Sequence, residues 1–138
     1  MTATPKNRIE AVNDFVVKFA NVNGSGSASA NELFARSLLR MGVPVSPRNI
    51  FPSNIQGLPT WYEVRVSERG WLGRRGGVDL MIAMNPQTWA RDVAEIEPGG
   101  YLLYYSSKPM PTMQLRDDIH VLGVPLADLC ATSYNDPR

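Results

Sequence analysis

The sequence has one cysteine, Cys130, and one histidine, His120, among its 138 residues. A single cysteine excludes an internal disulfide framework and cannot supply the several thiolates of an iron–sulfur cluster or a structural zinc site. A single histidine argues against a histidine-based metal site and against a Ser-His-Asp triad. We therefore expect no metal site and no catalytic residue within this chain.

An excess of charge of one sign is also missing, because 14 Lys and Arg residues face 13 Asp and Glu residues, for a net charge of +1. Nucleic acids and anionic membranes attract a basic excess, so neither is an expected partner. No apolar run approaches the roughly 20 residues that span a bilayer, and the polar first ten residues do not form a secretory signal. These features predict a cytoplasmic chain, with a flexible leader at 1–12 followed by one domain at 13–138.

Apolar runs separated by glycine- and proline-rich turns indicate the strands. Runs rich in β-branched and aromatic residues predict strands buried in a parallel sheet, and an alternating run predicts a strand with one apolar face. The buried strands are expected at 13–20, 78–84, 101–105 and 119–124, and the alternating strand at 61–68. The stretch 43–59 contains four prolines, which exclude a long helix or a central strand there and leave room for one short strand near 49–52.

Three helices are expected between and after these strands, at 27–41, 87–96 and 126–134. The apolar face of the first is predicted from the spacing of Leu33, Phe34, Ser37, Leu38 and Met41. Strands that alternate with helices predict an α/β domain with an open, mostly parallel sheet and flanking helices.

Three short helices are few for both faces of such a sheet, and parallel sheets are normally covered on both sides. The domain is therefore expected to pack against something larger, or to be a fragment of a longer chain. Pro98, Gly99 and Gly100 are expected to end the second helix. Cys130 is expected to be buried on the last helix, and His120 to lie on a strand with its hydrogen bonds satisfied.

The glycine-rich turn after the first strand is a candidate anion site; it consists of Asn23, Gly24, Ser25, Gly26 and Ser27. Glycines let backbone N–H groups approach an anion, and the following helix adds about half a positive charge, so a phosphate is the natural ligand. The turn lacks the third glycine of a dinucleotide fingerprint and the lysine of a P-loop. An ordinary tight turn between strand and helix explains the same residues.

Arg65 follows Trp61, Tyr62 and Glu63 on the alternating strand and could bind a carboxylate or phosphate through two N–H groups. It could equally pair with Glu63 on a solvated face. Asn85 comes directly after a buried strand, where open α/β sheets bind ligands, although Asn-Pro is also an ordinary helix start. A basic loop could receive a polyanion or be solvated; it contains Arg69, Trp71, Arg74 and Arg75.

Four blocks of sequence closely resemble a known family. They are NGSGSASAN at 23–31, MGVPVSP at 41–47, NIFPSNIQGLPTWYEVRVS at 49–67 and MNPQT at 84–88. The resemblance is to the gamma domain of 2-oxoacid:ferredoxin oxidoreductases, and within that family to the N-terminal part of the alpha subunit of 2-oxoglutarate:ferredoxin oxidoreductases. It covers about residues 13–135, and the block at 49–67 is the most specific.

The resemblance implies a component of an enzyme that decarboxylates a 2-oxoacid, expected to be 2-oxoglutarate, and transfers the acyl group to coenzyme A and the electrons to ferredoxin. It implies thiamine diphosphate, Mg²⁺ and an iron–sulfur cluster in the holoenzyme, with none of them bound by this chain alone. In such enzymes this domain helps cover the coenzyme A site. The implied partners are the remaining alpha-subunit domains, including a pyrimidine-binding domain before which this chain is truncated, and a thiamine-binding beta subunit.

From the resemblance and the strand ends together, we predict that a surface formed by the glycine-rich turn, Tyr62, Arg65 and Asn85 faces coenzyme A or the thiamine-bearing partner. A second function stays open on the residues alone, namely a non-catalytic nucleotide- or coenzyme-binding module or a regulatory interaction module. An independent enzyme would need an acid–base pair or cofactor ligands, and the sequence has no Gly-Asp-Gly…Asn thiamine motif. Under both interpretations the chain is inactive alone.

Overall fold

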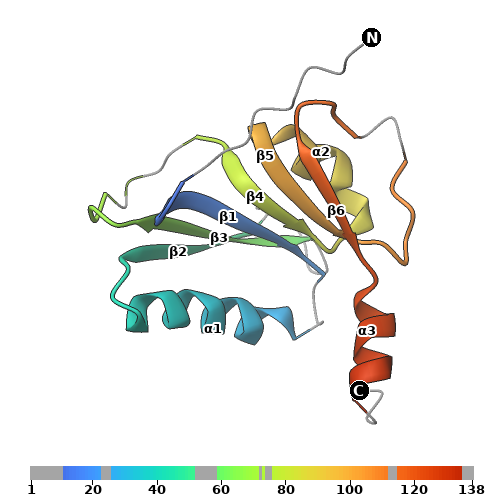
Figure 1. Cartoon of the computed structure of the whole chain (residues 1–138), viewed down its shortest axis with the longest axis horizontal. Coiled ribbons are helices and arrows are strands. Elements are labelled where there is room, and N and C mark those ends of the chain that lie inside the picture. The colour runs from blue at the N-terminus through green and yellow to red at the C-terminus, as the bar shows by residue number, and fades with distance from the viewer. Residues whose placement is uncertain are drawn as a thin grey trace.

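The computed structural model describes residues 11–22, 26–51, 59–71, 73, 76–111 and 115–134. Its strands are β1 (Asp14–Asn21), β2 (Val45–Ile50), β3 (Thr60–Ser67), β4 (Val78–Ala83), β5 (Ile96–Tyr105) and β6 (His120–Val124). Its helices are α1 (Ser27–Arg40), the short 3-10 helix η1 (Pro86–Thr88), α2 (Trp89–Ala94) and α3 (Leu126–Ser133). The strands form one six-stranded sheet in the order β2-β3-β1-β4-β5-β6 (Figure 1).

The sheet is mostly parallel. Strands β1, β4, β5 and β6 pair in parallel, whereas β3 is antiparallel to both of its neighbours, β1 and β2. Only β3 therefore runs against the other five described strands. These pairings confirm the predicted α/β class. Of the four strands expected to be buried, β1, β4 and β5 lie inside the sheet, whereas β6 lies at an edge. The proline-containing strand β2 lies at one edge, where a missing N–H is tolerated.

Helix α1 packs against β2 and β3 on one face of the sheet. Phe34 and Leu38 reach a cluster that includes Val64 and Val66 of β3. The predicted apolar face of this helix is confirmed for these two residues and was wrong for the other three, because Leu33 is 65% exposed, Met41 is 75% exposed and Ser37 is also exposed. The two buried residues of the helix are Ala35, which is small, and Asn31, whose side chain is hydrogen-bonded.

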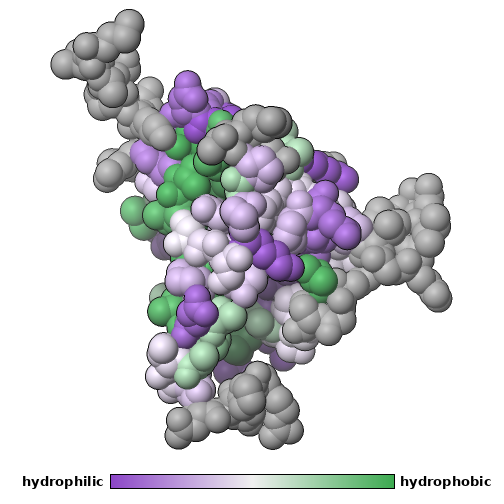
Figure 2. Space-filling model, turned by 90° about the vertical axis from the view of Figure 1, so that its right-hand side faces the viewer, coloured by the Kyte–Doolittle hydropathy of each residue, from purple (hydrophilic) through white to green (hydrophobic). Residues whose placement is uncertain are grey.

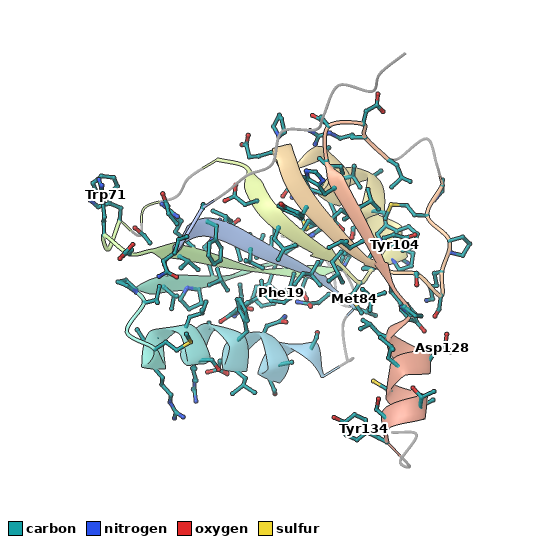
Figure 3. The ribbon with its side chains drawn as sticks, viewed as in Figure 1. Phe19, Trp71, Met84, Tyr104, Asp128 and Tyr134 are labelled. Carbon is teal, nitrogen blue, oxygen red and sulfur yellow. The ribbon has the colours of Figure 1, made fainter. Side chains whose placement is uncertain are left out.

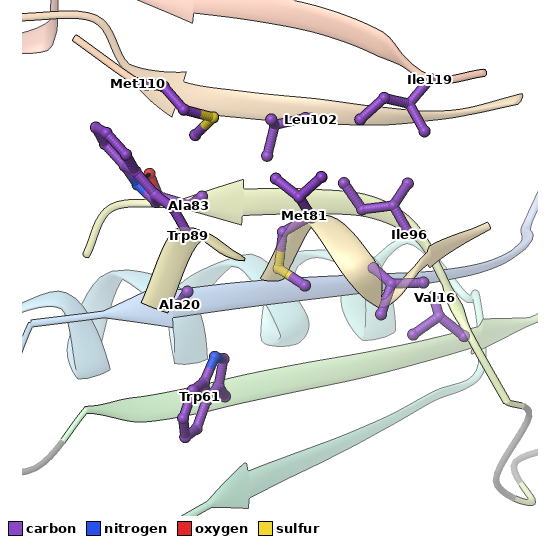
Figure 4. Close-up of a cluster of buried hydrophobic side chains, with 12 residues drawn as sticks. Val16, Ala20, Trp61, Met81, Ala83, Trp89, Ile96, Leu102, Met110 and Ile119 are labelled. Atoms are coloured by element: carbon purple, nitrogen blue, oxygen red, sulfur yellow. Dashed lines mark hydrogen bonds between the residues drawn. The ribbon is translucent and has the colours of Figure 1, made fainter. Parts of the chain in front are cut away.

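The opposite face carries the larger core, which is covered by α2 (Figure 4). Side chains alternate between the two faces along each strand, so Met81 of β4 and Leu102 of β5 point toward α2 and are fully buried. Trp89 and Val93 of α2 pack on this layer.

Strand β5 begins earlier than expected. Pro98, Gly99 and Gly100 lie inside β5 instead of ending the preceding helix, which already stops at Ala94. The pairing register between β4 and β5 shifts at this point. Gly99 has a φ of +84°, and a Cβ on Gly100 would lie 2.9 Å from the carbonyl oxygen of Asp79. The glycines therefore allow an irregular strand segment that passes close to β4.

Helix α3 leaves the carboxyl end of β6 and extends away from the sheet (Figure 1). None of its residues is buried. The prediction that Cys130 is buried was therefore wrong, since its side chain is exposed on this helix. Figure 2 shows hydrophobic residues at the surface on the side of the molecule that carries β6 and α3. No helix in the described ranges is long and apolar enough to cross a membrane.

Candidate functional site

The carboxyl ends of β1 and β4 lie side by side in the middle of the sheet. After β1 the chain continues to α1 on one face, and after β4 it continues to α2 on the other face. Open α/β sheets form their ligand-binding crevices at such a switch point. Residues 23–25 of the predicted turn lie outside the described residues, but Gly26, with a φ of +77°, and Ser27 lead into α1 at this place.

Three buried asparagines connect the two strand ends. The amide of Asn85 donates to the carbonyl oxygen of Asn21 at 3.4 Å, and its Oδ1 accepts a hydrogen bond from the backbone N–H of Gln87 at 3.1 Å. The amide of Asn31 in α1 donates to Oδ1 of Asn21 at 3.1 Å. Asn85 therefore caps η1. Through its bond to Asn21 and the bond of Asn21 to Asn31, it also links the ends of β1 and β4 to α1.

A buried carboxylate extends this network. Asp92 of α2 is fully buried; its Oδ1 accepts from the indole N–H of Trp61 at 2.8 Å, and its Oδ2 lies 2.6 Å from the hydroxyl of Thr88. That hydroxyl also lies 3.2 Å from the carbonyl oxygen of Asn85. Burial raises the pKa of Asp92, and the hydrogen bonds from Thr88 and Trp61 oppose this shift.

Both protonation states of Asp92 can be satisfied by this geometry. The ionised carboxylate accepts the proton of the Thr88 hydroxyl. The neutral acid instead donates to that hydroxyl, which is then free to donate to the carbonyl oxygen of Asn85. The network therefore links β3, α2 and the switch point without leaving a buried charge uncompensated.

A groove of about 950 Å³ lies on the α2 side of the sheet, between β1, β2, β3 and the end of α2. Trp61, which is 2% exposed, lies beneath two cations, with Lys18 Nζ 5.7 Å and the Arg91 guanidinium 4.4 Å from its ring centre. Charged residues from β1, β2, β3, α2, β5 and the segments that flank β5 line the groove, namely Lys18, Arg48, Glu63, Arg91, Glu95, Glu97 and Arg116.

The cations of this groove have carboxylate partners within the chain. Lys18 pairs with Glu95, which also binds Arg91 at 3.2 Å. Arg48 pairs with Glu63 at 3.4 Å. Arg116 pairs with Asp118 at 2.7 Å and donates to two carbonyl oxygens, one at the end of α2 and one at the start of β5. An anionic ligand would have to displace these partners.

Arg65 lies at the other end of β1 from the crevice. It pairs in register with Val16, five residues before Asn21, which places it about 16 Å along the strand from the crevice. Its Nη1 contacts Oδ1 of Asp14 at 2.7 Å, while Glu63 pairs with Arg48. The alternative expectation of a Glu63–Arg65 pair was therefore wrong.

Tyr62 lies on the α1 side of β3, where its ring packs at 6.4 Å from that of Phe19. It lines a smaller pocket of about 410 Å³ beside Glu32 and Arg36. Burial raises its pKa, with Glu32 adding to the shift and Arg36 opposing it. The structure therefore brings Gly26, Ser27 and Asn85 to the ends of β1 and β4, and Arg65 to the far end of β1. Tyr62 lies opposite Phe19, two residues before Asn21, in the pocket beside the first turns of α1. Contact of any of these residues with coenzyme A stays a prediction.

The remaining candidates are placed as follows. Arg69 stacks on Trp71 at 5.2 Å, and Arg74 and Arg75 lie outside the described residues. His120 lies on β6 as expected, stacked on Tyr101 at 4.9 Å.

Sequence reasoning missed the residues that connect the crevice. Thr88 and Asp92 are four residues apart in a predicted helix, a spacing at which side chains meet, and this signal could have found the pair. Lys18 interrupts an apolar strand, which is a comparable sign of a buried partner. The partners of Asn21 and Asn31 depend on how the helix packs on the sheet, and no local pattern indicates them.

Comparison with known proteins gives the family. A model of the pyruvate ferredoxin/flavodoxin oxidoreductase family matches residues 16–137. The chain belongs to this family. Its similarity to the alpha subunit of 2-oxoacid:ferredoxin oxidoreductase 2 of Aeropyrum pernix is 27% identity over 81 residues, which are 59% of this chain and 13% of that subunit.

Solved structures of oxidoreductase subunits share the fold. A 2-oxoglutarate:ferredoxin oxidoreductase of Magnetococcus marinus, solved with 2-oxoglutarate, coenzyme A and succinyl-CoA, matches with a TM-score of 0.74 at 22% identity, over 88% of this chain and 22% of its own. A pyruvate oxidoreductase subunit of Thermotoga maritima matches with a TM-score of 0.64 at 17% identity. The match covers 88% of this chain and 67% of that subunit. A keto/oxoacid ferredoxin oxidoreductase gamma subunit of Geobacter sulfurreducens matches with a TM-score of 0.66 at 17% identity. The match covers 86% of this chain and 65% of that subunit.

The oxidoreductase family implies redox cofactors, so we asked which side chains of this chain could ligate a metal ion or an iron–sulfur cluster. Within the described ranges, no three His, Cys, Asp or Glu side chains lie together as metal ligands. The one cysteine of the sequence is exposed on α3. These residues do not fit an iron–sulfur cluster, and we assign no step through such a group to them.

Proposed function

We propose that this chain is the gamma-type component of a 2-oxoacid:ferredoxin oxidoreductase. The complete enzyme would decarboxylate a 2-oxoacid, form the acyl thioester of coenzyme A and reduce ferredoxin. The match of the family model to residues 16–137 carries this proposal. The 2-oxoacid is proposed to be 2-oxoglutarate, which is supported by the Magnetococcus marinus structure and its bound substrates.

The chain is proposed to act by covering and orienting coenzyme A. Thiamine diphosphate with Mg²⁺ on a partner would stabilise the carbanion formed by decarboxylation, and an iron–sulfur cluster outside this chain would carry the electrons. The expected partners are the remaining alpha-subunit domains, the thiamine-binding beta subunit and ferredoxin. This division of labour agrees with a chain in which the buried side chains of Asn21, Asn31, Asn85 and Asp92 form hydrogen bonds within the chain.

The crevice at the ends of β1 and β4 is the proposed contact with coenzyme A. The start of α1 there has no acidic residue in its first turn, so its partial positive charge is available to a phosphate. Asn85, Asn21 and Asn31 hold the strand ends and the helix in a fixed relation. The residues at the crevice would therefore bind and position the coenzyme and take no part in proton transfer.

The test of the assembly is purification of the tagged chain from its native cells. The purified assembly is assayed for reduction of ferredoxin with 2-oxoglutarate or pyruvate, with and without coenzyme A. We expect reduction that requires coenzyme A and is faster with 2-oxoglutarate, and none from the isolated chain. Reduction by the isolated chain, or an assembly without a 2-oxoacid activity, would contradict the proposal and favour a separate binding module.

The crevice is tested in the same assembly with Ser27→Asp. The new carboxylate repels a phosphate but suits a helix N-terminus, so the KM for coenzyme A should rise about tenfold or more while the protein stays folded. Ser37→Asp is the matched control, because it puts the same charge on the same helix about 15 Å further along. Equal KM values for the two variants would mean that the crevice does not contact coenzyme A. They would not contradict the family assignment.

A further inference from the structure

The pocket of about 410 Å³ that Tyr62 lines, here called the α1 pocket, lies between α1 and the strands β2 and β3. Small-molecule sites have volumes of about 300–1,000 Å³ and are mostly apolar with a few polar groups. The apolar part of this wall comes from both the helix and the edge strand, namely from Ala28, Ala35, Leu39, Val45 and Pro47. An apolar wall on two sides suits a flat, uncharged ring.

The hydroxyl of Tyr62 is the first polar group of the α1 pocket. Tyr62 is only 7% exposed, and its hydroxyl has no hydrogen-bond partner among the described residues. Buried tyrosine hydroxyls usually have such a partner. Burial raises the pKa of Tyr62, and the nearby carboxylate of Glu32 adds to this shift. The hydroxyl therefore stays protonated at neutral pH and is available to donate a hydrogen bond to a ligand.

The ring that carries this hydroxyl is held by its neighbours. Phe19 lies between the sheet and α1 (Figure 3), and its ring centre is 6.4 Å from that of Tyr62 and 5.6 Å from that of Phe34 in α1. The position of a tyrosine hydroxyl is set by its ring. The donor in the α1 pocket is therefore fixed before any ligand binds, which lowers the entropy cost of binding.

Asn49 of β2 provides a second polar group beside the first. It is paired in register with Tyr62 and therefore lies on the same face of the sheet. Asn49 lines the α1 pocket, is exposed, and its amide has no hydrogen-bond partner among the described residues. An asparagine amide offers a donor and an acceptor side by side. This pair of groups matches adenine, whose N6 amine donates and whose N7 accepts.

The two charged residues of the α1 pocket compensate each other. Arg36 and Glu32 are four residues apart on α1 and form an ion pair at 2.5 Å. The pocket therefore presents no net charge from these groups, and a phosphate or carboxylate inside it would have to break the pair. An uncharged heteroaromatic ring meets no such cost.

We propose that the α1 pocket binds the adenine ring of a nucleotide. The amide of Asn49 pairs with the N6 and N7 edge of the ring, the Tyr62 hydroxyl donates to a further ring nitrogen, and the apolar side chains of α1 and β2 cover the two faces of the ring. Coenzyme A and free ADP carry the same ring, so either can be its source. With coenzyme A as the source, the inference deepens the proposed function and rests on it.

The position of the α1 pocket fits a nucleotide better than a free base. Ala28 belongs to the first turn of α1 and directly follows Ser27, where the helix begins. A sugar attached to the ring therefore carries its phosphates toward the start of the helix, whose partial positive charge attracts them. The ring and the phosphates would bind at neighbouring places on one helix.

The test is an NMR titration of the 138-residue chain with ADP, with GDP and with coenzyme A. We expect ADP to shift the amide signals of Asn49 and Tyr62 and to bind about tenfold or more tightly than GDP, because the asparagine amide matches adenine. Competition between ADP and coenzyme A would identify the coenzyme as a source of the ring. Binding of ADP without such competition would identify a free nucleotide.

Two substitutions that remove only polar groups test the contacts. Tyr62→Phe should weaken ADP binding about threefold to tenfold, the usual effect of one lost hydrogen bond, and Asn49→Leu should weaken it about tenfold or more. Tyr101→Phe is the matched control, because it removes the same hydroxyl from β5, and it should leave binding unchanged. The NMR spectrum of each variant without ligand shows whether it is folded.

The inference is overturned if ADP shifts no signal of the α1 pocket, if GDP binds as tightly, or if Tyr62→Phe and Asn49→Leu both bind ADP like the parent chain. Signals of the pocket that move only when another polypeptide of the oxidoreductase is added would equally overturn it. An assembly that reduces ferredoxin with coenzyme A while adenine does not bind would contradict this inference alone. Adenine binding by a chain whose assembly has no 2-oxoacid activity would instead contradict only the proposed function.

Discussion

On the α2 side of the sheet, strands β1, β2 and β3 carry charged side chains beside the end of the helix, namely the buried Lys18, the exposed Arg48 and the partly buried Glu63. On the α1 side, strands β4, β5 and β6 expose leucines, tyrosines and valines. The charges of the first surface pair with one another and tolerate water, whereas the second surface loses free energy for every exposed apolar group. The charges of the first surface are therefore paired within the chain, whereas the apolar side chains of β4, β5 and β6 on the α1 side, here called the open face, stay partly exposed among the described residues.

The largest expected effect comes from two adjacent leucines of β5 that lie on opposite faces. Leu102 is 0% exposed under α2, so Leu102→Ala should reduce the free energy of unfolding by about 2–5 kcal/mol. Leu103 points to the open face and is only partly buried, so Leu103→Ala should cost clearly less. Urea unfolding of both variants measures the difference. Equal losses would mean that the open face is already covered.

The stability that the paired charges contribute is tested by substituting two cations, Lys18 and Arg48. Lys18 is 4% exposed and bonded to Glu95, so Lys18→Met should cost roughly 1–3 kcal/mol by leaving a carboxylate without its buried partner. Arg48 is far more exposed, and Arg48→Met should cost about 0–1 kcal/mol. Chemical denaturation gives both values. If the two substitutions cost the same, the paired charges do not stabilise this surface as described.

A smaller effect is expected from the pH dependence of Asp92. Burial raises the pKa of Asp92 in the folded protein above its ordinary value of 3.8. A raised pKa favours the folded state at low pH, and this contribution is lost as the pH rises from 3.8 through the folded pKa. Asp92→Asn should therefore gain stability relative to the parent chain as the pH rises. Unfolding midpoints of the two proteins across that range provide the check, and parallel curves would contradict the raised pKa.

The sequence was sufficient for the fold where the signal is local. The apolar runs that became β1, β4 and β5 each contain enough β-branched and aromatic residues to indicate a buried strand, and Gly42 follows α1 in the left-handed conformation that is typical of a helix stop. The antiparallel direction of β3 was not predicted, because strand direction depends on the path of residues between strands. The position of Gly100 within β5 was missed for a similar reason, since only the approach of β4 requires it.

The candidate site was predicted less completely than the fold. Asn85 and the start of α1 come together at the crevice because parallel strands end at the same edge of a sheet. Arg65 was grouped with them from its place in a specific sequence block, yet strand pairing carries it to the opposite end, beside Asp14. The polar network of Thr88 and Asp92 joins residues from three elements. Its existence follows from packing, which a single sequence does not display.

The strand order also has a consequence for the chain while it is being made. Strand β1 comes first among the described strands and lies in the middle of the sheet, and the N–H of Val16 bonds to Asp79, 63 residues later. At synthesis rates of about 5–20 residues per second, β1 waits roughly 3–12 seconds for this neighbour. During that time its apolar run is a hazard for aggregation, and Lys18 interrupts it with a charge. In the folded protein the same lysine pairs with Glu95.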